Sequence, residues 1–522
     1  MSPEDLPDDP VLLREMLVAQ NAELANTKRV LSEQLARNER LEYLISQLQR
    51  IQFGRKSEKL DPDQLNLALD DIDTAIAEVF AEEEKADPKA RKTGAAERRA
   101  ARPSLPDHLP QVEVVIEPES TACPCCGGAM HRIGEDCSKR LDVIPAQYRV
   151  LVTRRPKYAC RACEGAIVQA SAPARLIEGG LPTEQLVAQV IVAKYADHSP
   201  LYRQCQAMAR QGIVIDRSTL ASWVGFAAAE LKPVWRCIRD NLLSSTKLFV
   251  DETEAPVLDP GRGRTKTGYF WAIARDDRPW GSKDPPVVVY IYAPGRGAKH
   301  VATMLEDFTG ILQTDGYQAY KTLVRQYNNA IALAHCWAHV RRKFFDISKK
   351  SPAPIADQAL NTIAQFYKVE AEVRGQSAES RRAVRQEKTR PLAEGFKEWC
   401  LGRLNEVSGK SNIAEALRYV LSHWEGLTRF LDDGRIEIDS NTVERSIRPI
   451  ALNRKNALFA GHDAGAENWA LLASLIENCK LNDVNPAAYL ADVLTKLVNN
   501  WPNSRLAELT PWAWAAANPR KL

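Results

Sequence analysis

From Lys247 onward the sequence alternates between strand-like and helical segments, and this order constrains the fold more than any other feature. Three strand-like runs come first, and helical segments near 298–308 and 320–326 separate two further runs. Another helix is expected from Trp337. The strand-like runs are KLFVDET, GYFWAIA, VVVYIYA, ILQTD and AIALAHC. The order β-β-β-α-β-α-β-α predicts an α/β domain built on one sheet.

Acidic residues stand at the ends of two of these strands. Asp251 ends the first strand and Asp315 ends the fourth. In a sheet of this order the two strand ends lie side by side, where two carboxylates can hold divalent ions about 3.5–4 Å apart. Oxygen ligands of this kind suit Mg²⁺ or Mn²⁺, two ions per site. Each aspartate alone could instead serve a turn, because Asp315-Gly316 is a turn dipeptide. Their matched placement favours a metal site.

A third carboxylate is expected from a later helix, and Glu444 in SNTVERSIRPIALNRKN is the preferred residue. The alternative is structural, because Asn441 can cap this helix and Glu444 can close a capping box three residues later. Glu437 and Asp439 are nearby competitors for the metal.

Basic and aromatic residues surround these acids. The run HCWAHVRRK follows the fifth strand, and cations beside acidic metal ligands suit a polyanionic substrate. A solvated basic helix face is the plain alternative. His335 and His339, four residues apart, could also bind zinc, but no fourth ligand is evident. The predicted DNA contacts here are Arg341, Arg342, Lys343, Arg445, Arg448, Arg454 and Lys455.

Six of the eleven cysteines lie within a short stretch, which favours a metal site over disulfides. Two C-x-x-C pairs, separated by 33 residues, can supply four thiolates to one tetrahedral Zn²⁺ in a ribbon-like domain. Four thiolates leave no open position, so the zinc is predicted to be structural. A redox pair is the rival interpretation. The predicted ligands are Cys123, Cys126, Cys160 and Cys163, with Cys125 and Cys137 as spare thiols.

Residues 11–53 contain neither Pro nor Gly and carry a leucine seam. Leu17, Leu24 and Leu31 recur every seven residues, and the seam continues after a phase shift. Such a seam predicts a coiled coil that joins copies of the chain as a homodimer or higher oligomer. A long helix packed on its own chain is the alternative.

Helical segments at 185–196, 201–210 and 216–230, with a turn at Gly212, form a helix-turn-helix pattern. Asp216 or Ser218 can cap the third helix. The residues predicted to reach DNA at its start are Arg217, Ser218 and Thr219.

The composition excludes several classes of protein. The chain has 522 residues, 45% hydrophobic and 26% charged, which rules out wholesale disorder and a collagen-like repeat. No apolar stretch approaches the roughly 18 residues of a membrane span, and the acidic start MSPEDLPDDP is not a secretory signal. An odd number of cysteines without such a signal favours a cytoplasmic protein.

The expected organisation is multidomain. It comprises a coiled coil at 1–60, a charged and Pro-rich linker at 61–110, a zinc-binding domain at 111–175, a helix-turn-helix domain at 176–235, the first part of the α/β core at 236–350, a helical insertion at 351–430, the final core helix at 431–475 and a C-terminal helical domain at 476–522.

Several longer motifs resemble those of the transposases of bacterial insertion-sequence family sixty-six, specifically the long transposase C subunit, across nearly the full length. The most specific are HCWAHVRRKFFD at 335–346 and DGRIEIDSNTVERSIRPIALNRKNALFAG at 433–461. Supporting matches are FGRKSEK, CPCCGG, IGEDCSKRLDVIPA, KYACRACEG, YADHSPLYRQ, VDET and TDGYQAY.

The resemblance implies a DDE-type transposase with a ribonuclease-H-like core and a helical insertion, whose triad is Asp251, Asp315 and Glu444. It also implies a nucleoid-associated enzyme that acts on element ends and target DNA with accessory proteins of the same element. Cys336-Trp-Ala-His339 resembles a C-x-x-H element of other transposases, which gives His339 an auxiliary role on the scissile phosphate. The competing hypotheses are an inactive DNA-binding regulator and a ribonuclease-H-like nuclease without strand transfer.

Overall fold

The computed structural model divides the chain into two compact units, Met1–Thr153 and Arg154–Leu522. The predicted zinc ligands Cys123, Cys126, Cys160 and Cys163 lie outside the described residues. Those residues are 9–25, 27–28, 31–32, 35, 87, 89, 91–93, 95–96, 147–159, 167–259, 264–326, 330–350, 352–457, 460 and 462–519. No helix within these ranges is both long and apolar enough to span a bilayer.

In the first unit the described part is mainly a helix at residues 10–25, and the described residues up to 35 are helical as well. The heptad leucines face solvent, since Leu17, Leu24 and Leu31 expose 57%, 53% and 56% of their surface. The helix is as predicted, and its apolar row is uncovered within the described part of the unit. Self-association through this row therefore stays a prediction.

The second unit begins with a short hairpin of β1 (Lys157–Ala159) and β2 (Ile167–Gln169), paired antiparallel. The run YRVLVTRR before the hairpin has no regular structure, and the first strand starts only at Lys157. Beyond the paired residues, hydrogen bonds from side chains to the backbone connect the two segments. Arg155 donates to the carbonyl of Ala170, and Gln169 donates to the carbonyl of Arg155, both at 2.9 Å.

Three helices follow: α4 (Glu184–Tyr195), α5 (Leu201–Ala209) and α6 (Arg217–Leu243). They start within one residue of the predicted positions. Asp216 holds the cap position of α6, but its side chain makes no capping hydrogen bond. The helix continues past Pro233, so the domain boundary expected at residue 235 falls inside it. The apolar face of α6 explains this continuity, because its buried side chains join the same core as the sheet.

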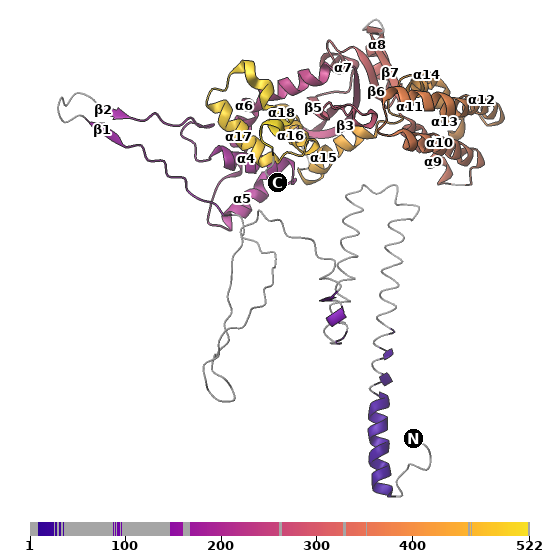
Figure 1. The fold of residues 1–522 in the computed structure, drawn as a ribbon, viewed down its shortest axis with the longest axis horizontal. Helices are drawn as coiled ribbons and strands as arrows, with labels where there is room; N and C mark the ends of the chain where they lie inside the picture. The colour runs from indigo at the N-terminus through magenta and orange to yellow at the C-terminus, as the bar shows by residue number, and fades with distance from the viewer. Residues whose placement is uncertain are drawn as a thin grey trace. The chain divides into compact units, whose positions relative to one another are not determined.

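A five-stranded mixed sheet forms the centre of the second unit, in the order β5-β4-β3-β6-β7 (Figure 1). Strands β3, β4 and β5 form an antiparallel meander, while β6 and β7 pair in parallel beyond β3. Their bounds are β3 Lys247–Asp259, β4 Arg264–Arg275, β5 Val287–Ala293, β6 Gly310–Thr314 and β7 Ile331–His335. All five predicted strands are present.

Both faces of this sheet are covered, which explains why β5 and the second half of β4, from Tyr269 to Ala274, are almost continuously apolar. Phe270 and Trp271 are consecutive on β4, so their side chains point to opposite faces. The Phe270 ring lies 4.5 Å from Trp469 of α16 (Asp463–Leu481), whereas the Trp271 ring lies 6.3 Å from Tyr320 of α8 (Gln318–Gln326). Helix α15 (Asn441–Ala457) packs on β3 and β4, and α7 (Ala298–Met304) packs on α8.

The region from 351 to 430 consists of helices joined by short turns and contains no strand where it is described, in agreement with the helical character predicted for it. Figure 1 shows these helices gathered beside β6 and β7. With α9 (Trp337–Ser348) they build a second apolar cluster around Trp337 and Phe366. The helices are α10 Pro354–Val373, α11 Ala378–Val384, the π-helical turn η4 Arg385–Thr389, α12 Arg390–Glu406, α13 Asn412–Ser422 and α14 Trp424–Thr428.

The chain ends in α17 (Pro486–Val498) and α18 (Pro511–Ala517), joined by the 3₁₀ segment η6 (Asn503–Leu509). Helix α17 packs on α4 and α6, and its buried residues belong to the same core as the sheet. Helix α16 runs across the boundary expected at 475/476. The C-terminal helices are therefore part of the main body of this unit, because their apolar faces complete its core.

Candidate carboxylate site and family membership

Asp251 and Asp315 occupy matched positions on neighbouring parallel strands. Phe249 of β3 pairs with Gln313 of β6, and each aspartate stands two residues further along the chain. Asp315 directly follows β6, as predicted, but Asp251 does not end its strand, because β3 continues to Asp259 through its pairing with β4. Asp315 also serves the expected turn, because its Oδ1 accepts from the backbone N–H of Tyr317 at 2.9 Å. Gly316 completes this turn with φ +91°, where a Cβ would crowd the ring of His423.

The electrostatics of Asp251 show that several acidic groups converge here. Its pKa rises from 3.8 to about 7, first through burial and then through the charges of Glu252, Asp315 and Glu444. The hydrogen bond from the Glu252 N–H to Asp251 Oδ1, 2.9 Å long, opposes this shift only in part. Among the residues that the structure describes, no Lys or Arg forms an ion pair with Asp251 or Asp315. A divalent cation is the partner that such oxygen ligands fit.

Three contacts bring the start of α15 to this part of the sheet. The side chain of Gln313 donates to the carbonyls of Glu437 and Asp439, at 2.7 and 3.0 Å. The Trp337 N–H donates to the carbonyl of Ile438 at 3.0 Å. The Ser440 N–H donates to Cys336 Sγ at 3.2 Å. Segments more than 100 residues apart are thus tied together, and Glu444 lies in the first turn of the helix that they position.

The competitors of Glu444 are engaged elsewhere. Glu437 Oε1 lies 2.7 Å from the guanidinium of Arg381. Asp439 accepts from the backbone and side-chain nitrogens of Asn441, at 3.1 and 2.8 Å. A capping box would need the Asn441 N–H to bond Glu444, but that donor belongs to Asp439. Glu444 instead receives a long contact of 3.4 Å from the Ser440 hydroxyl.

His339 and Cys336 lie beside Glu444. The ligand atoms of these three residues are all within 4.8 Å of one another. His339 Nδ1 is 3.7 Å from Glu444 Oε1, and burial raises the pKa of the Cys336 thiol to about 11. His335, the alternative zinc ligand, packs its ring against His423 instead, with centroids 5.1 Å apart.

Sequence reasoning missed a second layer around the aspartates. Glu252 is only 2% exposed and accepts from Arg296 Nε at 2.6 Å and from the Tyr320 hydroxyl at 3.0 Å. The Arg296 guanidinium also lies 3.9 Å from the ring centroid of Tyr317. The acidic neighbour of Asp251 and the tyrosines of TDGYQAY were visible in the sequence, but nothing in it linked them to Arg296.

The predicted basic contacts take different places. Lys343 lies 4.8 Å from the Tyr419 ring centroid and pairs with Glu415 at 3.4 Å, while Arg341 lies over Phe345 at 5.5 Å. Arg454 donates to the carbonyl of Glu254. Arg448 is half-buried; Arg342, Lys455 and the helix-start residues Arg217, Ser218 and Thr219 are exposed.

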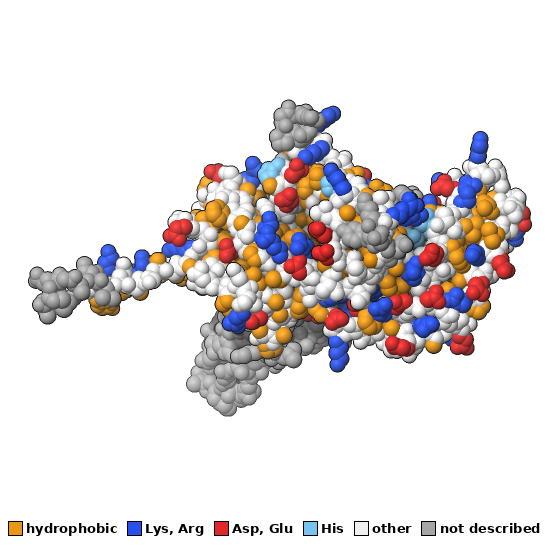
Figure 2. All heavy atoms as spheres, turned by 90° about the horizontal axis from the view of Figure 1, so that it is seen from above, with side chains coloured by type: hydrophobic (Ala, Val, Ile, Leu, Met, Phe, Trp, Pro, Cys, Tyr) orange, Lys and Arg blue, Asp and Glu red, His pale blue; other side chains and the backbone are white. Residues whose placement is uncertain are grey.

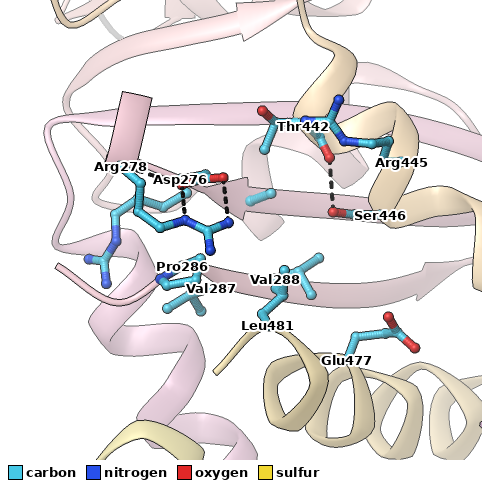
Figure 3. Close-up of a pocket in the computed structure, with 12 residues that line it drawn as sticks. Asp276, Arg278, Pro286, Val287, Val288, Thr442, Arg445, Ser446, Glu477 and Leu481 are labelled. Atoms are coloured by element: carbon cyan, nitrogen blue, oxygen red, sulfur yellow. Dashed lines mark hydrogen bonds and ion pairs between the residues drawn. The ribbon is translucent and has the colours of Figure 1, made fainter. Parts of the chain in front are cut away.

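Arg445 lines a cavity of about 240 Å³ between α15, α16 and the ends of β4 and β5 (Figure 3). Arg278 and Glu477 also line it. On the face drawn in Figure 2, basic and acidic side chains are interspersed. Any DNA contact on this face therefore depends on individual cations, not on a uniformly basic surface.

Comparisons with known proteins agree with this organisation. A family model described as "Transposase IS66 family" matches residues 179–468, more than half of the chain. Models for the "zinc-finger binding domain of transposase IS66", for "Transposase C of IS166 homeodomain" and for the "IS66 C-terminal element" match 120–164, 40–114 and 474–512. The zinc-finger match lies within the predicted zinc-binding domain, whereas the 40–114 match crosses the boundary predicted at 60.

Curated relatives extend over the whole chain. "Uncharacterized protein y4jD" of Sinorhizobium fredii (strain NBRC 101917 / NGR234) is 44% identical over 98% of both chains. "Uncharacterized protein y4qI" of the same organism is 43% identical over 97% of both. "Uncharacterized protein y4hP" is 37% identical over 92% of this chain and 89% of its own length.

The zinc-finger match supports a structural zinc, and the family matches together support a transposase with zinc-finger and DNA-binding regions. The chain belongs to the IS66 family of transposases.

Proposed function

We propose that this protein cuts the ends of an insertion sequence and joins them to target DNA, with Asp251, Asp315 and Glu444 as metal ligands. The observation that carries the proposal is the matched placement of Asp251 and Asp315 on neighbouring parallel strands, where burial first and then the charges of Glu252, Asp315 and Glu444 raise the pKa of Asp251. Maintaining such mutual repulsion is unfavourable unless a cation fills the site in the working state.

The fold supports the proposal. We interpret the β5-β4-β3-β6-β7 sheet, with α15 packed across β3 and β4, as a ribonuclease-H-like core. Asp251 lies opposite Ala272 of β4, on the face that bears Phe270, and this face is covered by α16. Helix α15 carries Glu444 in its first turn, and the Glu444 charge adds to the effect of burial in raising the pKa of Asp251. The helical insertion and the other predicted domains complete the proposed architecture.

The residues of the site have separate proposed roles. Asp251 and Asp315 would bind Mg²⁺ or Mn²⁺ from matched positions on neighbouring strands, and Glu444 would bind from the helix. Two bound ions would stabilise the attacking and leaving oxygens, first for water at the element end and then for the freed 3′-hydroxyl at the target. His339 and the cations Arg341, Arg342 and Arg448 would hold the phosphates in line.

Other regions would deliver the DNA. The start of α6 presents Arg217, Ser218 and Thr219 to solvent, where they can contact element ends. Cys123, Cys126, Cys160 and Cys163 would hold the structural zinc, since four thiols are a complete ligand set for it. The leucine row of residues 17–31 would join copies of the chain, and accessory proteins of the element would complete the assembly.

The deciding experiment uses Glu444→Gln, which removes charge but keeps shape and hydrogen bonding. We expect normal folding and end binding, with Mg²⁺-dependent nicking and strand transfer lowered by at least about 100-fold. Labelled element ends on a gel report strand-transfer product, cleavage alone or binding alone, which separates the transposase from the nuclease and the regulator.

Asp439→Asn is the matched control, because Asp439 lies five residues before Glu444 and is occupied by Asn441. Its nicking should stay within a few fold of wild type. Nicking kept in Glu444→Gln but lost in Asp439→Asn would move the third ligand and refute this assignment.

A further inference from the structure

Cys336, His339 and Glu444 form a group of metal-binding side chains, and the roles proposed for His339 and Glu444 do not explain why Cys336 lies with them. Cys336 caps the start of α9, and His339 lies one turn further along the same helix. Glu444 comes from the first turn of α15. Their ligand atoms all lie within 4.8 Å of one another, and the described residues contain no other group of this kind.

One polar atom in this group lacks a hydrogen-bond partner. His339 Nδ1 is buried without a hydrogen bond, and its 3.7 Å separation from Glu444 Oε1 is too long for one. A buried nitrogen without a partner is unfavourable, and a bound ion is one of the explanations for such an atom. The position between His339 and Glu444 is where an ion would satisfy both.

Cys336 is prepared for a metal in a different way. It is 1% exposed, and its sulfur accepts the Ser440 N–H at 3.2 Å. Hydrogen bonds of this kind orient metal ligands from outside the first shell and support a negative sulfur. Binding would release the thiol proton to solvent as the sulfur–metal bond forms.

The kinds of ligand atom in this group determine which ion it would bind. Sulfur and imidazole nitrogen favour zinc and disfavour magnesium, which prefers oxygen. Bonds of about 2.0–2.3 Å place neighbouring ligand atoms of a tetrahedral zinc roughly 3.3–3.8 Å apart. His339 Nδ1 and Glu444 Oε1 already fit this range. The side chains of His339 and Glu444 are 26% and 27% exposed, so they can close the remaining gap by small rotations.

We infer that Cys336, His339 and Glu444 form a second zinc site, with one position left for water or a phosphate oxygen. Binding there does not require the proposed reaction. Its consequence does rest on that proposal, because an ion held by Cys336 and His339 would withdraw Glu444 from Asp251 and Asp315. Zinc would then lower Mg²⁺-dependent nicking.

The test counts zinc in the full-length chain, dialysed against buffered free Zn²⁺ without DNA. Wild type should bind one ion more than Cys336→Ser and one more than His339→Asn. In both variants the free zinc needed to fill the extra site should rise by at least about tenfold. Cys205→Ser is the matched control, because Cys205 is a half-buried cysteine on α5 and should leave the count unchanged.

Cobalt gives an independent readout. Co²⁺ added to the chain at a free Zn²⁺ concentration that fills only the structural site should produce a thiolate charge-transfer band in wild type and Cys205→Ser, and no such band in Cys336→Ser. Equal zinc counts in wild type and His339→Asn would overturn the inference, and so would a cobalt band that survives in Cys336→Ser. Because Cys336 is buried, His339→Asn decides the count if Cys336→Ser fails to fold.

A nicking assay on the same preparations separates this inference from the proposed function. An extra zinc in a chain that fails to nick DNA with Mg²⁺ even after the extra ion has been dialysed away would refute the proposed reaction and leave the zinc site standing. Active nicking with equal zinc counts would refute the zinc site alone.

Discussion

Two groups of acidic side chains in Arg154–Leu522 are withdrawn from water, but only one of them has cations beside it. In the arginine cluster, defined by Arg381, Arg385, Glu370 and Glu437, every carboxylate has a guanidinium within 2.6–2.7 Å. In the carboxylate group, defined by Asp251, Asp315 and Glu444, burial first and then the neighbouring acidic charges raise the pKa of Asp251. The first group has its cations within the protein, whereas in the described residues neither aspartate of the second group forms an ion pair with Lys or Arg.

This difference separates acidic groups that stabilise the fold from acidic groups that destabilise it locally. The arginine cluster ties α10, α11 and η4 to the segment before α15, since Arg385 also donates to the carbonyls of Phe430 and Asp433. The arginine cluster thereby fixes the helical insertion to the segment that leads into α15, the helix that carries Glu444. The carboxylate group gives up stability at the site that this scaffold holds in place, as functional sites commonly do.

Breaking the arginine cluster should have the largest effect. Arg385→Met leaves Glu370 buried without its bidentate partner, and we expect a loss of about 3–5 kcal/mol in the free energy of unfolding. Urea unfolding measures it. Arg382→Met, at the exposed neighbouring position, should change stability by less than about 0.5 kcal/mol. Equal effects of the two variants would show that the cluster is not a stabilising unit.

Removing a charge from the carboxylate group should instead raise the free energy of unfolding. The folded pKa of Asp251, about 7, lies above its value of 3.8 in a free side chain. Between about pH 4 and pH 7 the folded state therefore binds more protons than the unfolded state, and stability falls as pH rises. Asp251→Asn does not titrate, so above pH 7 it should be more stable than wild type by about 1–3 kcal/mol.

Urea unfolding at pH 5 and pH 8 in magnesium-free buffer tests this difference. Asp240→Asn, at a position whose side chain is 63% exposed, is the control and should show no such gain. If Asp251→Asn is less stable than wild type at pH 8, the carboxylate group is not mutually repulsive.

Adding the missing cation should make the two groups alike. At ten times its dissociation constant, Mg²⁺ should stabilise wild type by about 1.4 kcal/mol. The gain should shrink below pH 7, because protons then compete for Asp251. It should vanish in Asp251→Asn and persist in the exposed control Asp240→Asn. Thermal melts with and without Mg²⁺ at pH 6 and pH 8 provide the measurement, and a gain in Asp251→Asn would place the ion elsewhere.

The leucine row of the first unit extends the comparison to apolar surface, and here the expected effect on stability is smallest. Deleting residues 1–53 should lower the oligomeric state, because Leu17, Leu24 and Leu31 are exposed without a partner in the described part of their unit. The melting temperature of the remaining chain should stay unchanged. Light scattering decides; equal oligomeric states before and after deletion would mean that this helix packs within its own chain.

The sequence was sufficient to predict much of the secondary structure of this protein. Strand and helix periodicity predicted all five strands of the sheet, the helical insertion and the starts of α4, α5 and α6, because these depend on local patterns. The family resemblance also came from local motifs, and the IS66 family models match them. The roles of the site residues stay predictions, since the position of a residue along a strand does not show whether it binds a metal or takes part in a reaction.

Only the tertiary structure decided which charges are paired. The sequence preferred Glu444 and left Glu437 and Asp439 as competitors within eight residues. Only the fold brings Arg381 to Glu437 and gives the Asn441 N–H to Asp439. It likewise placed Arg445 in a cavity, Arg296 against Glu252, and α6 and α16 across two expected domain boundaries. The physical reason is that secondary structure follows from neighbours a few residues apart, whereas charge pairing and core continuity depend on side chains brought together over tens to hundreds of residues.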